Sequence, residues 1–395
     1  MKIPLSSPDI TDNEISRVCQ VLRSGNLSLG PCLQEFEEKF SRFVGTRFAV
    51  AVNSGTSALH LAVKALGITR GDEVITTSFS FVASTNCFLY EGAMPVFVDI
   101  DPATFNMDPA ALLQFLVQKC RRDCHTTVHI ETGRTIKAIL PVHVFGLPCN
   151  MGAICEIARE FELAIIEDSC EALGASYGGR NVGTFGDVAA FGFYPNKQMT
   201  TGEGGILVTN EERIARQCRS LRNQGRGPNQ GWLDHEILGY NYRLSDIHAA
   251  IGLAQLERIR ELLQAREQLA RQYSEALANM RGIKLPPQVE GAVRSWFVYV
   301  VQVPGGKTVR DRVITNLRAD GIGCQAYFPA IHKQPYMQEI LGDLQPNLPC
   351  TDNAAAACLA IPFSSRMTSV EAAQVSQRLA LALEESHSAE LVTAA

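Results

Sequence analysis

Between residues 47 and 209 the sequence alternates short apolar runs with helix-like segments. Most of the runs are continuous rather than alternating, which is typical of strands covered on both faces in a mostly parallel α/β sheet. Helix-like segments such as Ser57–Leu66 and Met151–Phe161 separate the runs and would cover the sheet. The predicted strands are Arg47–Val52, Glu73–Thr77, Pro95–Asp99, Ile136–Val142, Ala164–Asp168, Val188–Phe193 and Gly205–Thr209.

Beyond residue 209 the pattern changes to longer helices. Residues Ser245–Asn279 read as one long or broken helix, and a loop with two adjacent prolines follows it. A strand over Trp296–Val303 and a helix over Val309–Asp320 begin further α/β units. We therefore expect three parts: an N-terminal segment (residues 1–25) that packs on the small domain, a large domain (26–245), and the long helix with a smaller C-terminal α/β domain (246–395).

Composition excludes several classes of protein. Hydrophobic residues make up 46% of the chain and charged residues 19%, so it can bury a sizeable core and is not globally disordered. The net charge of −5 argues against a protein that coats nucleic acid. No apolar run approaches the ~20 residues that cross a bilayer, and the first residues turn polar before a signal-peptide core could form. We expect a soluble, cytoplasmic protein without a membrane partner.

The 12 cysteines are scattered, so most are expected to be buried thiols rather than disulfide partners. Cys120, Cys124, His125 and His129 form one cluster with zinc-ligating side chains. Their compact spacing, in a basic and loop-like stretch, matches no common zinc finger. We favour a solvated insertion over Cys120–Glu131, assign it no role, and predict no metal.

The segment NSGTSALHLAVKAL (53–66) places a turn with Gly55 between a predicted strand and a helix. Exposed N–H groups at a helix N-terminus favour an anion, and Ser54, Thr56 and Ser57 add hydroxyl donors. The alternative is an ordinary N-cap, in which Thr56 or Ser57 only caps an amphipathic helix. This segment alone leaves both interpretations open.

Two further segments end buried strands with chemically useful side chains. In TTSFSFVAST (76–85), Phe79 and Phe81 would point the same way in an extended chain, either into the core or with one stacked on a flat ring. In AIIEDSCEALGA (164–175), Glu167 and Asp168 stand at the carboxyl end of a strand, where α/β sheets bind ligands. A carboxylate there suits a metal, a ribose hydroxyl or a protonated ring nitrogen.

A lysine follows the sixth predicted strand, in DVAAFGFYPNKQMTTGEGGILV (187–208). Lys197 is either a surface lysine or a Schiff-base lysine that attacks a carbonyl group. Each of these segments is weak evidence alone. Together, an anion cradle, an aromatic plate, a strand-end Asp and a loop Lys meet the four needs of pyridoxal 5′-phosphate (PLP): its phosphate, ring face, ring nitrogen and aldehyde.

These segments resemble the DegT/DnrJ/EryC1/StrS family of PLP-dependent sugar aminotransferases, and the resemblance extends over nearly the whole chain. Further matching segments are LSLGP (27–31), GDEVITTSFSFVAS (71–84), PVFVDID (95–101), PVHVFG (141–146), GYNYRLSDIHAAIG (239–252) and YFPAIHKQP (327–335). The resemblance implies the aspartate aminotransferase-type fold, fold type I. That fold has a mostly parallel seven-stranded sheet in a large domain and a smaller C-terminal α/β domain.

The resemblance also implies roles for residues around the cofactor ring. Lys197 would form the Schiff base and later carry the proton. Asp168 would pair with the pyridinium nitrogen, and Phe81 would stack on the ring. Glu171 would lie on the side of the cofactor's phenolic oxygen, where many relatives have Gln or His.

Other implied roles concern the phosphate and the second substrate. Thr56 and Ser57 would bind the phosphate within one chain. Asn241, with Arg243, would reach the phosphate of the neighbouring subunit's cofactor, which would make the protein a homodimer with composite active sites. His332 would contact the nucleotide-sugar.

One residue departs from the family pattern. Many relatives have a phosphate-binding Ser five residues before the lysine, and this chain has Gly192. A water or Thr201 could replace that hydroxyl donor. The departure concerns cofactor affinity and not the type of reaction.

The reaction that the resemblance implies moves an amino group from L-glutamate to a nucleotide-linked keto-sugar. Glu171 and the GYNYR segment resemble the branch that acts on 4-keto-6-deoxyhexoses, such as the perosamine-forming enzymes, so we favour amination at C4. The alternatives are an NDP-3-keto-sugar aminotransferase, a PLP-dependent sugar dehydratase and a non-enzymatic regulatory protein. Dehydratase relatives have His in place of Lys197, and no helix-turn-helix or basic stripe supports a regulator.

Overall fold

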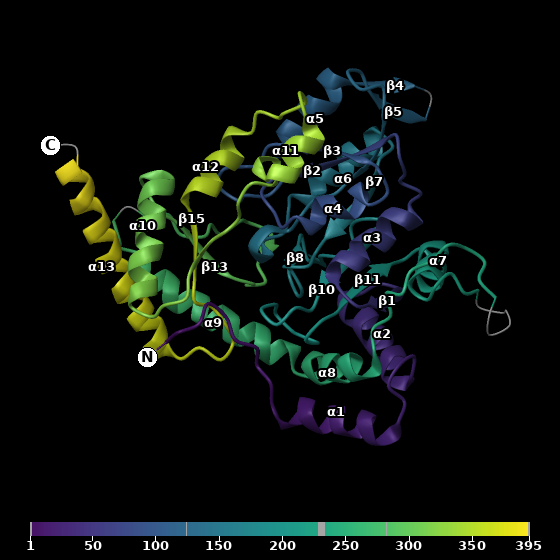
Figure 1. Cartoon of the computed structure of the whole chain (residues 1–395), viewed down its shortest axis with the longest axis horizontal. Helices are drawn as coiled ribbons and strands as arrows, with labels where there is room; N and C mark the ends of the chain where they lie inside the picture. The colour runs from purple at the N-terminus through teal and green to yellow at the C-terminus, as the bar shows by residue number, and fades with distance from the viewer. Residues whose placement is uncertain (1, 124, 228–233, 282, 394–395) are drawn as a thin grey trace.

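The computed structural model describes residues 2–123, 125–227, 234–281 and 283–393 (Figure 1). Its centre is a nine-stranded sheet. The strands are β1 (Phe48–Val52), β2 (Asp72–Thr77), β3 (Met94–Val98), β4 (Cys120–Asp123), β5 (Thr126–His129), β6 (Thr135–Ile139), β7 (Ala164–Asp168), β10 (Val188–Gly192) and β11 (Gly205–Thr209).

Seven of these strands follow the order β1-β11-β10-β7-β6-β2-β3. The neighbours from β10 to β3 pair in parallel, whereas β11 is antiparallel to both β10 and β1. The predicted mostly parallel seven-stranded sheet is therefore confirmed. The antiparallel hairpin β4–β5 pairs with β6 and adds the other two strands.

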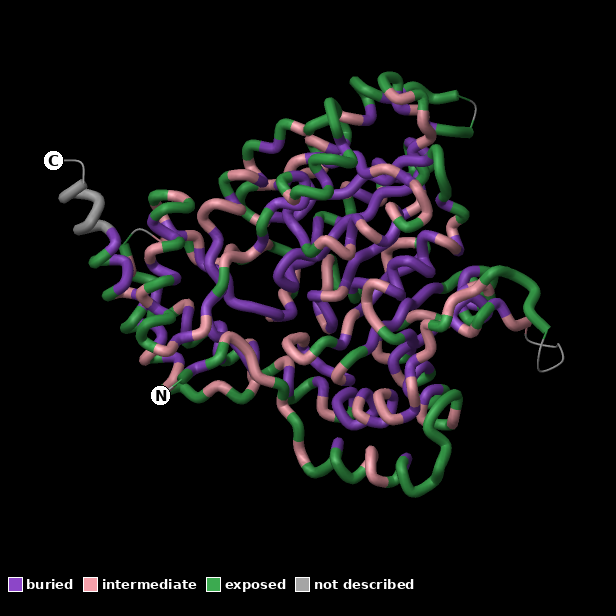
Figure 2. The backbone as a smooth tube through the Cα atoms, viewed as in Figure 1, coloured by how far each residue is buried: buried purple, intermediate pink, exposed green. Residues whose placement is uncertain are grey.

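Helices connect the strands of the large domain and cover its sheet. They are α3 (Gly55–Ala65), α4 (Ala83–Leu89), α5 (Pro109–Lys119), the 3₁₀ helix η1 (Val144–Gly146), α6 (Met151–Glu160) and α7 (Glu212–Arg222). Residues on these helices and strands form the core that Figure 2 shows as buried, in which Val50, Ala190 and Leu207 have no exposed surface. The central strands β10 and β11 are continuous apolar runs because helices and loops cover both of their faces.

The C-terminal part follows α8 (Asp246–Glu257) and α9 (Ile259–Leu277). The predicted long helix is thus broken, at Arg258, whose backbone leaves the helical range at ψ 16°. The remaining elements are β13 (Tyr299–Gln302), α10 (Gly306–Ala319), β14 (Gln325–Ala326), η2 (Ile331–Lys333), α11 (Pro335–Leu341), α12 (Pro349–Ala357), β15 (Cys358–Ile361) and α13 (Ser369–Thr393). β13, β15 and β14 form a small antiparallel sheet, and β8 (Ser176–Tyr177), β9 (Arg180–Asn181) and β12 (Ala292–Val293) form another.

The N-terminal residues pack on the C-terminal part of the chain. Ile3 forms a β-bridge with Ile322, and the Phe363 N–H donates to the Leu5 carbonyl at 2.8 Å. Helix α1 (Asp12–Ser24) then lies along α8 (Figure 1), and α2 (Pro31–Val44) leads into β1. The first residues therefore contact the small domain, and α1 contacts the helix that precedes it.

The cysteine–histidine cluster is a β-hairpin, not the loop that the sequence analysis expected. His129 is buried on this hairpin, and its Nδ1 lies 2.8 Å from Glu73 Oε2. His125 is exposed and lies near Glu162, while Cys124 lies outside the described residues. In the described part of the chain, no group of three or more metal-ligating side chains could hold a metal ion, and every cysteine is a free thiol. Within the same ranges, no helix has the length and apolar character needed to cross a membrane.

Candidate active site

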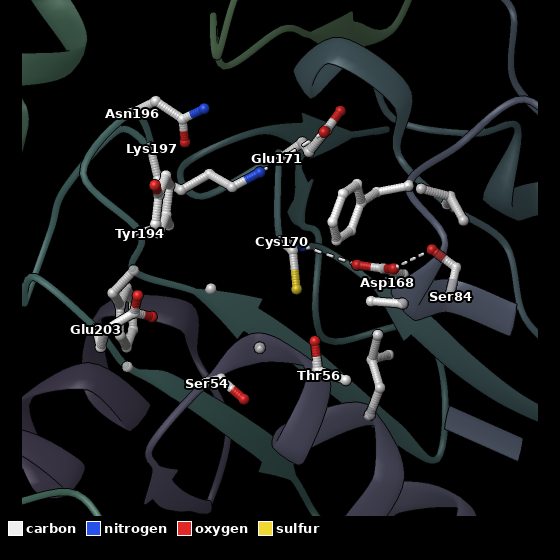
Figure 3. Close-up of a pocket in the computed structure, with 18 of the residues that line it drawn as sticks. Ser54, Thr56, Ser84, Asp168, Cys170, Glu171, Tyr194, Asn196, Lys197 and Glu203 are labelled. Carbon is white, nitrogen blue, oxygen red and sulfur yellow. Dashed lines mark hydrogen bonds and ion pairs between the residues drawn. The ribbon is translucent and has the colours of Figure 1, made fainter. Parts of the chain in front are cut away.

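A cavity of about 420 Å³ opens at the carboxyl ends of β7 and β10 (Figure 3). Parallel strands deliver side chains to this edge of a sheet, and the loops that follow them build the walls. Residues from both domains line the cavity: Ser54, Gly55, Thr56, Leu59, Phe81, Ala83, Ser84, Val142, Asp168, Cys170, Glu171, Gly192, Phe193, Tyr194, Asn196, Lys197, Glu203, Gly204, Tyr327 and Phe328.

Lys197 lies on the turn that follows β10, and its side chain points into the cavity (Figure 3). Its N–H donates to the Tyr194 carbonyl at 2.9 Å, which closes the turn. Its Nζ lies 3.6 Å from Glu171 Oε1 and 3.8 Å from the centroid of the Phe297 ring. The side chain is 16% exposed, so Lys197 is not a surface lysine.

Asp168, the last residue of β7, is 4% exposed, and both of its carboxylate oxygens are bound. Oδ2 accepts a hydrogen bond from the Ser84 hydroxyl at 2.7 Å, and Oδ1 accepts from the Cys170 N–H at 3.1 Å. Glu167, its neighbour, lies outside the cavity lining, where His143 and backbone N–H groups near Phe185 surround it. Of the two strand-end acids, only Asp168 is therefore available to a ligand in the cavity.

Glu171 forms the wall next to Lys197. Its Oε2 accepts a hydrogen bond from the Phe145 N–H at 2.9 Å. Burial raises the pKa of this carboxyl group above its ordinary value, while the charge of Lys197 and the Phe145 N–H oppose that rise. The cavity therefore places an amine and a buried carboxyl group next to each other.

The N-terminus of α3 forms the opposite end of the cavity. Ser54 is the N-cap, because its hydroxyl accepts from the Ser57 N–H at 3.0 Å, while Thr56 lines the cavity. The Ser57 hydroxyl donates to Asn53 Oδ1 at 2.7 Å, so its side chain supports the cap and does not line the cavity. The cap is therefore Ser54 and not Thr56 or Ser57, as the capping alternative expected, and anion binding at this helix N-terminus remains a prediction.

Glycines allow the backbone to approach closely at this end. A Cβ at Gly55 would lie 3.0 Å from Cys170 Sγ and 3.2 Å from the Gly192 Cα, closer than ordinary contact. A Cβ at Gly192 would meet its nearest neighbours at 3.5 Å, which is ordinary contact. The departure at Gly192 therefore has no steric reason in the chain's own packing, and Thr201, whose hydroxyl donates to the Glu203 carbonyl at 2.6 Å, is not among the lining residues.

The two phenylalanines of the TTSFSF segment point in different directions and lie in different environments. Phe81 is 61% exposed and lines the cavity, whereas Phe79 is fully buried in an aromatic cluster with Phe105, Phe145 and Phe328. The expectation that they share a face is wrong because residues 78–80 form a bend, so the two-residue period of a strand does not apply.

Besides Ser57, three more predicted site residues lie outside this lining: Asn241, Arg243 and His332. The Arg243 guanidinium donates to Asn223 Oδ1 at 3.0 Å, and exposed Asn241 forms a β-bridge with Asn223. Buried His332 has Nδ1 2.7 Å from the Ser78 hydroxyl and Nε2 3.2 Å from Asp352 Oδ1. Burial lowers the pKa of His332, against the opposing charge of Asp352. Their roles toward the cofactor and the sugar remain predictions.

Three residues that contact Asp168 or Lys197 are not singled out in the sequence. Ser84 donates to Asp168, Phe297 contacts the Lys197 amine, and Arg266 donates to the Lys197 carbonyl. Nothing in the sequence marks Ser84, because its contact with Asp168 depends on how α4 packs. Arg266 did leave a signal: it falls on the apolar stripe of α9, four residues after Leu262 and three before Leu269, and all three are buried. An arginine on a buried helix face needs partners and so merits attention.

Comparison with known proteins agrees with this geometry. The sequence matches the model of the DegT/DnrJ/EryC1/StrS aminotransferase family over residues 8–380, which include the whole cavity lining. A relative named GDP-perosamine synthase, from Caulobacter vibrioides, is 43% identical over 337 residues, 85% of this chain and 86% of that protein. The structure of S. venezuelae DesV in complex with a ketimine intermediate matches with a TM-score of 0.85 and 31% identity over 98% of both chains. The PLP form of the putative sugar aminotransferase Spr1654 from Streptococcus pneumoniae matches with a TM-score of 0.88 and 27% identity, over 98% of this chain and all of that one.

Proposed function

We propose that this chain aminates C4 of a nucleotide-linked 4-keto-6-deoxyhexose, with L-glutamate as the amino donor. The chain belongs to the DegT/DnrJ/EryC1/StrS aminotransferase family and is a PLP-dependent sugar aminotransferase. Two observations support the choice of substrate. The relative named GDP-perosamine synthase shares 43% of aligned residues with this chain. A glutamate at position 171 resembles the pattern of the branch that acts on 4-keto sugars, and this residue lines the cavity 3.6 Å from the Lys197 amine.

The residues present fit PLP. The cavity contains an amine that can condense with an aldehyde (Lys197), a buried carboxylate for a ring nitrogen (Asp168) and an exposed aromatic ring (Phe81). At its other end, Ser54 and Thr56 stand at a helix N-terminus, which favours a phosphate. When bound, PLP supplies an aldehyde that condenses with amines and a ring that accepts the electron pair left at Cα.

The chain's own residues then have three tasks. Lys197 carries the proton that leaves Cα of the donor, and Glu171 beside it offers a second protonatable group. Asp168 presents an oriented carboxylate, since Ser84 and the Cys170 N–H each hold one of its oxygens. The aromatic side chains of Phe81, Tyr327 and Phe328 wall the cavity and limit the access of water.

We also infer a homodimer with composite sites. Asn241 and Arg243 lie outside the lining of their own chain's cavity, and Asn241 is exposed. The family resemblance assigns this segment to the phosphate of the neighbouring subunit's cofactor. An exposed polar segment that does not serve its own site is consistent with that assignment.

The observation that carries the proposal is the meeting of Lys197, Glu171 and Asp168 in one cavity. The test loads the enzyme with PLP, converts it with L-glutamate, and offers a panel of NDP-keto-sugars to the aminated enzyme, with products identified by mass spectrometry. We expect a 4-amino-4,6-dideoxy sugar and conversion of glutamate to 2-oxoglutarate. A 3-amino product, or conversion only with another amino donor, would contradict the proposed substrate or donor respectively.

A further inference from the structure

A single guanidinium group joins the backbones of Lys197 and Phe297. Arg266, on α9, is 2% exposed; its Nη2 donates to the Lys197 carbonyl at 2.8 Å and its Nη1 to the Phe297 carbonyl at 3.1 Å. Its guanidinium also lies 5.7 Å from the centroid of the Phe363 ring. A buried arginine costs stability unless its donors are used. Nη1 and Nη2 are used here and connect Arg266 to both segments, while its Nε has no hydrogen-bond partner among the described residues.

The side chains of the two residues that Arg266 joins also meet. The Lys197 Nζ lies over the face of the Phe297 ring, 3.8 Å from its centroid. Phe297 is 1% exposed and belongs to the hydrophobic core. Cation–π attraction is strongest where water is excluded, as it is at this ring.

The residue after the lysine strengthens the same connection. The Gln198 side-chain amide donates to the Ser295 hydroxyl at 3.1 Å and to the Glu171 carbonyl at 2.5 Å. Arg266 and Gln198 therefore hold the lysine turn against residues 295–297 from two directions. The result is a fixed distance between the base of the Lys197 side chain and the ring that its amine contacts.

We propose that Phe297 is a catalytic residue of this aminotransferase. Its ring is the docking face for the Lys197 ammonium while the lysine is free and carries a proton. Arg266 is the positioning residue that sets the distance between the ring and the lysine. A ring face suits this task because it attracts the cation without accepting its proton. Glu171, 3.6 Å from the same amine, provides the charged side of the dock. The proposal rests on the aminotransferase reaction and not on the identity of the sugar.

The test compares variants in enzyme loaded with pyridoxamine 5′-phosphate, in which Lys197 is free whatever the amino donor. The variants are Phe297→Leu, which removes the ring, Phe297→Tyr, which keeps it, and Arg266→Lys. Arg271→Lys is the matched control, because Arg271 lies on the same helix, is exposed, and bonds only to Glu267 among the described residues. Acetylation of Lys197 by an amine-reactive ester is followed by peptide mass spectrometry, with exposed Lys333 as the internal standard.

We expect Phe297→Leu and Arg266→Lys to speed acetylation of Lys197 relative to Lys333 several-fold, and to lower kcat about ten-fold with the KM for the nucleotide-sugar within two-fold of wild type. Arg271→Lys should behave as wild type in both measurements, and Phe297→Tyr, which keeps the ring face, should keep the slow acetylation of Lys197. Unchanged acetylation in Phe297→Leu would overturn the docking role. If Phe297→Leu fails to fold, wild-type acetylation in Arg266→Lys overturns the positioning role and with it the proposal. Failure of the proposed sugar to react leaves the acetylation result unaffected, so the two failures are distinguishable.

Discussion

Ser84 and Asp168 lie 84 residues apart in the sequence, yet the Ser84 hydroxyl donates a 2.7 Å hydrogen bond to Asp168 Oδ2. Both residues are buried and both line the cavity (Figure 3). The bond connects the start of α4 with the end of β7, so helix packing sets the orientation of the carboxylate. Because this carboxylate would face the ring nitrogen of PLP, Ser84 should influence cofactor binding without reacting itself.

Ser84→Ala should therefore weaken retention of PLP. A hydrogen bond to a charged group contributes about 1.5–3 kcal/mol, so we expect roughly ten-fold weaker binding or more. The measurement is a PLP titration of cofactor-free protein followed by visible absorbance. Thr85→Val is the matched control: Thr85 is also buried on α4, and among the described residues its hydroxyl has no hydrogen-bond partner. Equal affinities for the two variants would contradict the role of Ser84.

Glu171→Gln should stabilise the cofactor-free protein at neutral pH. Burial raises the pKa of Glu171 above its ordinary value of 4.5, so the folded protein binds this proton more tightly than the unfolded chain. The folded state consequently loses stability as the pH rises through the raised pKa, and a neutral glutamine avoids this loss. Urea unfolding at pH 5, 7 and 8 should show a stability gain for the variant that shrinks toward pH 5. Glu203→Gln, an exposed acid in the same cavity, should show no such trend, and a pH-independent difference for Glu171→Gln would refute the argument.

His129→Ala should destabilise the protein without changing its chemistry. The substitution leaves the buried Glu73 carboxylate without its 2.8 Å partner, and among the residues that the structure describes only Arg134, at 3.6 Å, remains as an ion-pair partner. Loss of a partner for a buried polar group costs about 1–3 kcal/mol. Denaturant unfolding should detect this loss, while kcat stays at the wild-type value because the hairpin does not line the cavity. His125→Ala, on the same hairpin but exposed, is the control and should have no effect.

The order and type of the elements in the large domain could be predicted because its strands are covered on both faces. Continuous apolar runs such as Ala164–Asp168 and Gly205–Thr209 have the bounds expected from the sequence. The same reasoning places Asp168 and Lys197 at one edge of the sheet, since parallel strands end there together. Their positions in one cavity follow from strand ends, and their roles in the reaction remain predictions.

What could not be predicted depends on contacts between distant segments. Ser84 is one of many serines until α4 packs against β7. Phe79 and Phe81 point in different directions because residues 78–80 form a bend, which the local sequence does not predict. The hairpin around His129 gives no strand signal in the sequence, because its strands are only four residues long and mostly polar on one side. Arg266 was detectable in principle, by its place on the apolar face of a helix.

The composite active site gives the last prediction. Asn241 is exposed and outside the lining of its own chain's cavity, and we infer that it reaches the cofactor phosphate of the neighbouring subunit. A doubly charged phosphate at the N-terminus of α3 needs further donors, and this chain has Gly192 where many relatives have a hydroxyl. Asn241→Ala should therefore weaken PLP retention, and an Asn241→Ala homodimer at limiting PLP should lose most of its activity.

Mixing inactive subunits tests whether the site is shared. In a heterodimer of Asn241→Ala with Lys197→Ala, one composite site carries both defects and the other carries neither, so activity should return at limiting PLP. Lys197→Ala mixed with Asp168→Asn is the matched control, because both residues line the same chain's cavity and each site of that heterodimer keeps one defect. That mixture should stay inactive although its heterodimers form, as native mass spectrometry would show. Activity from neither mixture, with heterodimers present in both, would mean that the phosphate is held within one chain.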